Sequence, residues 1–170
     1  MTRTMYDSVD WQKIPANAKM VAGYVDGAFA WPAEAWARFP KAAHVRISVI
    51  PPGDPKDAGV LDVESGAASV ADAPGFIRDR RQKKKRAVIY VERSLVADIR
   101  KACTGLDYGL WVADWTGKPH KLADMNKVVA VQWSGGVDVP YDISEVFDRT
   151  WHPQGVVAKV QERLGLIPAS

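Results

Sequence analysis

The octet "GVLDVESG", residues 59–66, carries the pattern that decides the fold. Leu61 and Val63 alternate with Asp62 and Glu64 along it. Side chains two positions apart in a β-strand point to the same side, so the two apolar residues share one face and the two acids share the other. The octet therefore predicts a strand that packs Leu61 and Val63 against a helical layer and directs both carboxyl groups toward the opposite side.

Further short runs rich in Val, Ile and aromatic residues predict other strands. With the octet, the predicted strands cover residues 5–9, 20–26, 44–50, 59–65, 87–92, 108–114, 128–133 and 141–144. Helix-like segments lie between several of them, at residues 32–39, 71–82 and 94–103, and a last one covers 155–165. This alternation predicts a largely parallel sheet with helical crossovers, and about eight strands favour closure into a barrel.

The length of 170 residues is short for a complete (β/α)8 barrel, which usually needs at least ~200 residues. The links at residues 51–58 and 134–140 are too short for helices. We therefore expect an α/β fold, a short (β/α)8-like (TIM-type) barrel with several helices missing. The barrel is expected over residues 1–150, and residues 151–170 are expected to form a C-terminal helix or linker stub.

The composition is that of an ordinary globular protein, with 47% hydrophobic and 25% charged residues. Most of the net charge of +3 comes from "RDRRQKKKR" at residues 78–86. We expect this run to be the solvated end of a helix and the following loop. The alternative is that it attracts the protein to an anionic cell wall, an attraction that salt would weaken. The aromatic residues lie elsewhere in the sequence, so we expect no nucleic-acid partner.

Other features of the sequence exclude several classes of protein and site. The single cysteine, Cys103, excludes an internal disulfide and is typical of a reducing compartment. His44, His120 and His152 are scattered, so we expect no metal site. No apolar run approaches the ~20 residues that span a membrane, and no signal peptide is evident, so we expect no membrane insertion.

The predicted strand at residues 59–65 places Asp62 and Glu64 at its carboxyl end, where barrel enzymes keep their active sites. Two like charges this close raise at least one pKa and keep a proton available near neutral pH. Glycoside hydrolysis needs such an acid and a second carboxylate. Asp62, two residues before the acid, is placed to orient a 2-acetamido group that acts as nucleophile, which points to an N-acetylated amino sugar. Alternatively, both acids are exposed residues at a loop edge.

Six motifs in order resemble those of the family 25 glycoside hydrolases, the peptidoglycan muramidases of phage lysins and bacterial autolysins. They span residues 5–148 and read "YDSVDWQ", "LDVES", "VIYVE", "LWVADW", "AVQWSGG" and "YDIS". The resemblance implies a glycosidase barrel. Two positions depart from the family pattern. Ser144 stands where the family usually has Asn, and Asp26 ends the second strand where the family usually carries a basic residue.

Carried over by position, the resemblance implies a role for each of several side chains. Glu64 would be the general acid, and Asp62 would orient the acetamido group. Asp7 and Asp142 would complete the acidic floor. The residues implied to line the sugar site are Tyr90, Trp111 and Gln132. Further candidates at the rim are Trp133, Asp26 and Asp114, of which Asp26 is equally consistent with a turn. Trp31, Trp36, Trp115 and Trp151 are expected to pack rather than to bind sugar.

The function expected from this sequence is that of an endolysin-type N-acetylmuramidase, a lysozyme that cleaves the glycan strands of peptidoglycan. The resemblance implies a monomer without metal or organic cofactor, held in the host cytoplasm until release to the bacterial cell wall. Three alternatives remain open. They are a non-catalytic cell-wall glycan-binding barrel, an amidase or phosphodiesterase on the same barrel, and a nucleic-acid-binding protein based on the basic run.

Overall fold

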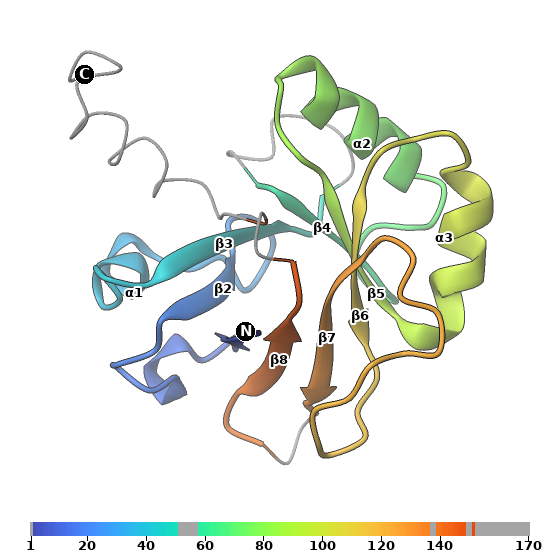
Figure 1. Cartoon of the computed structure of the whole chain (residues 1–170). Helices are drawn as coiled ribbons and strands as arrows, with labels where there is room; N and C mark the ends of the chain where they lie inside the picture. Colours follow the sequence, from blue (N-terminus) through green and yellow to red (C-terminus); the bar gives the residue numbers. More distant parts are fainter. Residues whose placement is uncertain (1, 51–57, 137–138, 149–150, 152–170) are drawn as a thin grey trace, which may run out of the picture.

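The computed structural model describes residues 2–50, 58–136, 139–148 and 151. Eight strands close into a barrel in the order of the sequence (Figure 1). They are β1 (Arg3–Asp7), β2 (Met20–Tyr24), β3 (Ala43–Ser48), β4 (Val60–Val63), β5 (Val88–Glu92), β6 (Gly109–Ala113), β7 (Val128–Ser134) and β8 (Asp142–Val146). Each of the eight predicted segments overlaps one strand, so the number and order of the strands are confirmed.

The last strand runs against the others. Strands β1 to β7 pair with their neighbours in parallel, whereas β8 is antiparallel to both β7 and β1. Only residues 135–141 link β7 to β8. A parallel crossover needs about a dozen residues or more, so this short link makes β8 return as the second strand of a hairpin. The barrel is therefore mixed. The largely parallel sheet and the scarcity of helices agree with expectation, whereas a TIM-type barrel, in which all strands are parallel, is not what the strands form.

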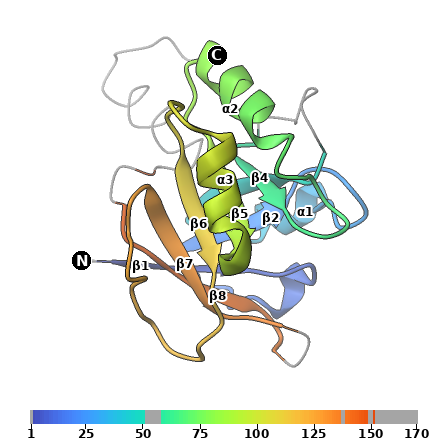
Figure 2. The same cartoon turned by 90° about the vertical axis from the view of Figure 1, so that its right-hand side faces the viewer.

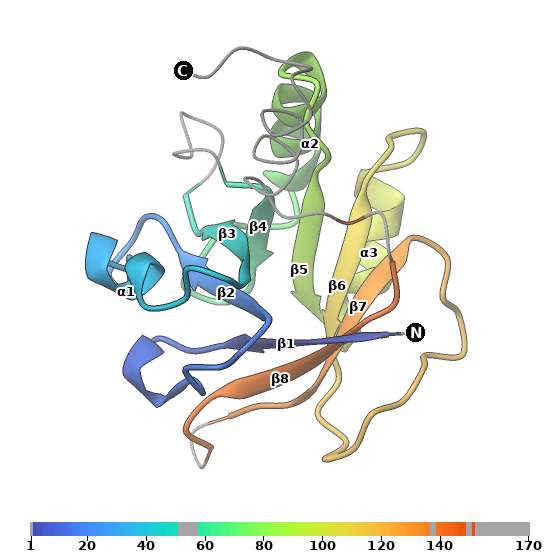
Figure 3. The same ribbon diagram turned by 60° about the vertical axis from the view of Figure 1, so that its left-hand side comes forward.

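Few helices surround the barrel, as expected. They are α1 (Ala33–Ala37), α2 (Ala73–Gln82) and α3 (Val96–Ala102), with short 3-10 turns at Trp11–Lys13 and Arg93–Leu95. Helices α2 and α3 lie over β4, β5 and β6 (Figure 2), and α1 lies beside β2 and β3 (Figure 3). In the described part of the chain, β1 and β8 carry no covering helix (Figure 3). The predicted helix at 155–165 and most of the predicted link at 51–58 lie outside the described residues.

Two apolar layers confirm the alternation expected for β4. Leu61 and Val63 point outward and pack with Phe76 and Ile77 of α2 and Ile99 of α3. The other face of the strands fills the barrel. Its side chains include Met5, Met20, Val45, Ile47, Val60, Val88, Trp111, Val129, Val146 and Trp151. Because these side chains fill the interior, the barrel is a packed core and not a pore.

A smaller apolar cluster lies under α1. Trp31 is buried there with Ile14, Ala35 and Phe39, and Trp36 packs against them. The packing role predicted for Trp31, Trp36 and Trp151 is confirmed. None of the helices in the described residues is both long enough and apolar enough to span a membrane.

Candidate active site

A pocket of about 480 Å³ opens at the carboxyl ends of the parallel strands. Asp7 and Tyr24 are the last residues of β1 and β2, and Glu64 follows the last residue of β4. Because β8 is antiparallel, its first residue, Asp142, lies at the same end. The remaining lining residues are Ser8, Val9, Asp10, Lys13, Tyr90, Trp115, Gly136, Val139, Pro140 and Tyr141. The structure therefore brings Asp7, Glu64, Tyr90 and Asp142 together, as the sequence predicted.

Asp62 and Glu64 form one wall, at different depths. Asp62 is 0% exposed and lies behind the pocket surface, whereas the Glu64 side chain is exposed and lines the pocket. Tyr24 Oη donates a hydrogen bond to Asp62 Oδ2 at 3.0 Å. Asp62 Oδ1 is buried and has no hydrogen-bond partner of its own among the described residues when both acids are ionised. The sequence predicted that Asp62 contacts an acetamido group directly. In the structure no atom of Asp62 is exposed to make that contact.

The two carboxyl groups hold a proton near neutral pH. Burial, followed by the negative charge of Glu64, raises the pKa of Asp62 to about 7. Burial also raises the pKa of Glu64, although a hydrogen bond with Asp62 opposes the rise. Since each acid influences the other, the two carboxyl groups titrate as a pair.

Two more acids face this pair. Asp7 and Asp142 are directly opposed in the β1–β8 ladder. Burial of its carboxyl group, and then the charge of Asp142, raises the pKa of Asp7 well above its ordinary value. Burial raises the pKa of Asp142 to about 6. At neutral pH, Asp142 is therefore largely ionised, whereas Asp7 keeps its proton to a higher pH than an ordinary aspartate does.

Gln132 of β7 connects the acids to the aromatic wall. Its Oε1 accepts hydrogen bonds from Tyr90 Oη at 2.9 Å and Trp115 Nε1 at 2.7 Å. Its Nε2 donates to Asp7 Oδ2 at 2.9 Å and to Asp142 Oδ2 at 3.4 Å. Two donors on one side and two carboxyl groups on the other determine which way the amide points. Gln132 is thus a support beneath the pocket, rather than the sugar-lining residue expected from the sequence.

Trp115, assigned to packing from the sequence, is a wall of the pocket. Its side chain is 57% exposed, and it is the second residue after the end of β6. The indole rests on Gly135, where an added Cβ would lie 2.5 Å from Trp115 Nε1. The signal that could have identified Trp115 is its place just beyond a strand's carboxyl end. The sequence analysis did not predict Tyr24 as a site residue either. Its place as the last residue of β2, at the same end of the barrel as Glu64, is the signal that could have identified it.

Trp111 and Trp133 do not lie where the resemblance implied. Trp111 is 0% exposed in the barrel interior, where its Nε1 donates to Ser144 Oγ at 2.9 Å. It can support Tyr90, whose ring centroid is 4.8 Å away, but it has no surface for a ligand. Trp133 follows Gln132 in β7, is half-buried and is not part of the pocket lining.

The two acids proposed for the rim have structural partners. Asp26 is buried, and it accepts hydrogen bonds from Ser48 Oγ at 2.6 Å and the Val49 backbone N–H at 2.8 Å. This ties the end of β2 to the end of β3, which agrees with the turn alternative. Asp114 lies 2.5 Å from Arg93 Nη1 and 2.9 Å from His120 Nε2. Although burial opposes it, these hydrogen bonds lower the pKa of Asp114. Neither acid lines the pocket.

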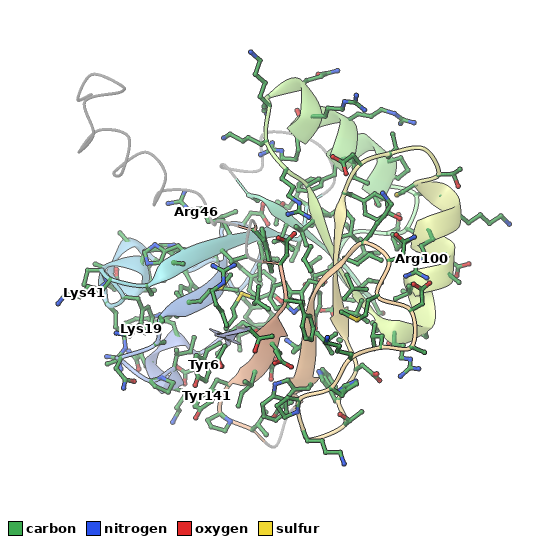
Figure 4. The ribbon with its side chains drawn as sticks, viewed as in Figure 1. Tyr6, Lys19, Lys41, Arg46, Arg100 and Tyr141 are labelled. Atoms are coloured by element: carbon green, nitrogen blue, oxygen red, sulfur yellow. The ribbon has the colours of Figure 1, made fainter. Side chains whose placement is uncertain are left out.

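Four described residues between β7 and β8 complete the wall: Gly136, Val139, Pro140 and Tyr141. Tyr141 packs edge to face on Tyr6, with ring centroids 5.4 Å apart (Figure 4).

Among the described residues, no group of three or more His, Cys, Asp or Glu side chains is arranged to hold a metal ion.

Comparisons with known proteins concern the fold. No protein-family model matches the chain. No curated protein matches it. Among solved structures, it is similar to GHIP, a glycosyl hydrolase 25 of Streptococcus pneumoniae described as a novel virulence factor participating in host cell invasion. The similarity covers 98% of this chain and 94% of that chain at 11% sequence identity, with a TM-score of 0.53. The chain therefore has a barrel fold like that of a glycosyl hydrolase 25.

Proposed function

We propose that this protein is a glycoside hydrolase that cleaves the glycan strands of peptidoglycan as an N-acetylmuramidase of the lysozyme type. The observation that carries the proposal is the Asp62–Glu64 pair, which holds a proton near neutral pH and presents one carboxyl group to a pocket at the barrel mouth. The fold similarity to a glycosyl hydrolase 25 supports the same class of reaction.

In this proposal Glu64 is the general acid. It is the exposed member of the pair, and a glycosidic oxygen in the pocket can therefore reach it. Asp62 acts through Glu64, because the hydrogen bond between the two carboxyl groups lowers the pKa of Glu64 and raises that of Asp62, so that the protonation of one depends on the other. Asp62 is thus a positioning residue, and Tyr24, which donates to it, belongs to the same unit.

Asp142 is the carboxylate best suited to the other half of the reaction. Its pKa of about 6 leaves it ionised at neutral pH, and it lines the pocket. A carboxylate there can accept the N–H of a 2-acetamido group and stabilise the positive charge that develops when that group attacks the anomeric carbon. Gln132 holds Asp142 in place and, by also binding Asp7, keeps the two acids in fixed positions.

Trp115 and Tyr90 are proposed as the aromatic surfaces of the sugar site. Both line the pocket, and both are held by Gln132 Oε1. Aromatic faces pack well on the apolar faces of pyranose rings, and the exposed indole of Trp115 offers the larger area. Val9, 55% exposed on the facing loop, extends this apolar surface.

The biological setting of the proposal follows from the same activity. The partner is the peptidoglycan glycan strand, the protein acts as a monomeric phage endolysin, and the reaction requires no metal or organic cofactor. It remains in the cytoplasm of the infected bacterium until the membrane is permeabilised, and then acts on the cell wall.

The test is the release of reducing sugar from purified peptidoglycan by the wild type, Glu64→Gln and Glu34→Gln. Glu34 is an exposed glutamate of α1 and serves as the matched control. Loss of the general acid is expected to reduce release by about 10²- to 10⁴-fold, while Glu34→Gln retains wild-type release. Mass spectrometry of the fragments should show cut glycan, and cut peptide would instead indicate an amidase.

A non-catalytic glycan-binding module is the second candidate, favoured by the complete burial of Asp62. It predicts equal, background release from the wild type and Glu64→Gln, with wall binding retained by both. That result would contradict the enzyme proposal.

A further inference from the structure

Charge is strongly polarised along this chain. Residues 78–86 contain seven cationic side chains and one anionic one, a formal charge of +6, whereas the whole chain carries +3. The remainder of the protein is therefore net acidic. The acids of the pocket account for part of this, since Asp7, Asp10, Glu64 and Asp142 line it with a single cation, Lys13.

The basic run lies at the end of the barrel opposite the mouth. It begins in α2, which ends at Gln82, and continues to the start of β5 at Val88. The amino end of β5 points away from the carboxyl-end pocket, and Figure 1 shows the end of α2 on that side. Nitrogen-tipped side chains gather around α2 in Figure 4. A ligand bound there leaves the pocket open.

Three cations of the run form no ion pair within the part of the chain that the structure describes. Asp79 is already paired with Arg80 at 2.6 Å and with Lys83 at 3.3 Å. Arg80 is buried and also donates to the Ala58 carbonyl oxygen at 2.9 Å, so its role is structural. By contrast, the side chains of Arg78, Arg81 and Lys84 are exposed and form no ion pair with any described residue.

Two of these cations, Arg78 and Arg81, line a groove. It has a volume of about 390 Å³ and lies between α2 and the turn after α3. Its lining consists of Ile77, Arg78, Arg81, Gln82, Leu106 and Asp107. Arg78 and Arg81 are three residues apart, and neighbours at this spacing lie on one face of a helix. Their planar guanidinium groups suit phosphate oxygens, while Ile77 and Leu106 provide an apolar surface between the charges.

The surroundings of the groove do not suit nucleic acid. Binding of single strands relies on exposed aromatic rings that stack on bases. In the described chain the exposed large hydrophobic side chains are Val9, Phe29, Ile50 and Trp115. All four follow carboxyl ends of strands, at the mouth. Phe76 and Tyr108, the aromatic residues next in sequence to the groove lining, are both buried.

We propose that this groove and the adjoining basic run bind a polyol-phosphate polymer, in which phosphate groups alternate with short carbon segments. The phosphates lie against Arg78, Arg81 and Lys84, and the carbon segments lie on Ile77 and Leu106. Binding at the end of the barrel opposite the mouth holds the protein on the polymer while its pocket faces away, free to accept another ligand. This inference does not depend on the proposed catalytic activity.

The test is calorimetric titration of the full chain with poly(glycerol phosphate) at low salt. The variant Arg78→Gln/Arg81→Gln/Lys84→Gln removes the three unpaired cations. The matched control is Lys19→Gln/Lys41→Gln/Lys118→Gln, which changes the net charge equally at three exposed lysines. Figure 4 shows Lys19 and Lys41 on the α1 side of the molecule, away from α2.

We expect the first variant to bind at least about tenfold more weakly and the control within about twofold of the wild type. Each contact between a cation and a phosphate releases counterions from the polymer and makes binding more sensitive to salt. If a contact contributes as much as on a flexible polyanion, the loss of three contacts should reduce the magnitude of the slope of log K against log salt concentration by about 2 in the first variant. Chito-oligosaccharide present at saturation should leave the affinity unchanged, since the two sites lie at opposite ends.

Three results would overturn the proposal. Equal weakening in both triple variants would indicate attraction by net charge alone. Competition between the polymer and chito-oligosaccharide would place the polymer in the mouth. Tighter binding of single-stranded DNA, or of phosphatidylglycerol vesicles, than of poly(glycerol phosphate) would identify a different class of partner.

Discussion

The raised pKa of Asp62 makes the stability of this protein depend on pH. Its ordinary value of 3.8 rises to about 7 in the folded chain, because the carboxyl group is buried beside Glu64. Between these two values the folded state retains the proton and the unfolded state has lost it. The stabilisation is therefore fully present below pH 3.8 and is lost as the pH rises through about 7.

The perturbation is Asp62→Asn, which keeps an oxygen to accept the Tyr24 hydrogen bond but removes the titration. A shift of about three pKa units corresponds to about 4 kcal/mol in total. Integrated between pH 5 and pH 8, the contribution of Asp62 amounts to about 2 to 3 kcal/mol. The wild type should lose at least this much free energy of unfolding over that interval, and the variant should lose about 2 to 3 kcal/mol less.

The assay is urea denaturation of both proteins at pH 5 and pH 8. Asp72→Asn is the matched control, because hydrogen bonds from Ser69 lower the pKa of Asp72, which is therefore ionised in both states across this interval. The control should follow the pH dependence of the wild type. If Asp62→Asn also follows it, Asp62 does not retain a proton, and the reasoning behind the proton-sharing pair fails.

Three further results are expected. Tyr24→Phe removes a hydrogen bond that lowers the pKa of Asp62, so the alkaline limb of the pH–rate profile should move to higher pH; an unchanged limb would contradict the coupling. Gly135→Ala places a Cβ 2.5 Å from Trp115 Nε1 and should weaken chito-oligosaccharide binding by about three- to tenfold in calorimetry, whereas Gly59→Ala, which meets open space, should not. Arg80→Met leaves the Ala58 carbonyl oxygen without its buried donor and should cost about 2 kcal/mol in urea denaturation, against less than about 0.5 for the exposed Arg81→Met.

Much of the barrel could be predicted because local pattern determines which side of a strand is buried. The alternation at residues 61–64 correctly separates Leu61 and Val63 from Asp62, and the outer and inner apolar layers follow from it. The direction of β8 was accessible in principle, since residues 135–141 are too few for a parallel crossover. Missing it left the barrel assigned as a TIM-type fold.

The candidate site was predicted less completely, because its members meet only when the barrel closes. The sequence placed Trp111 at the sugar and Trp115 in packing, and the structure reverses these positions. From the sequence, Asp26 could be either a residue of the pocket rim or a turn residue. The hydrogen bond from Ser48, on the neighbouring strand, decides for the turn. Strand alternation gives a side chain's face, but it does not say how deep in the barrel that side chain lies.

By itself, the sequence determined that eight short strands would follow one another and that Asp62 and Glu64 would share a face at the carboxyl end of one of them. Those properties depend on the twofold repeat of an extended backbone and on residues close in the chain. Only the tertiary structure decided that Asp62 is buried while Glu64 is exposed, and that Gln132 joins Asp7, Asp142, Tyr90 and Trp115. Burial and hydrogen-bond partners across a closed barrel arise from residues as far as 125 positions apart, and it is their desolvation and charge that raise the pKa values on which the proposed chemistry depends.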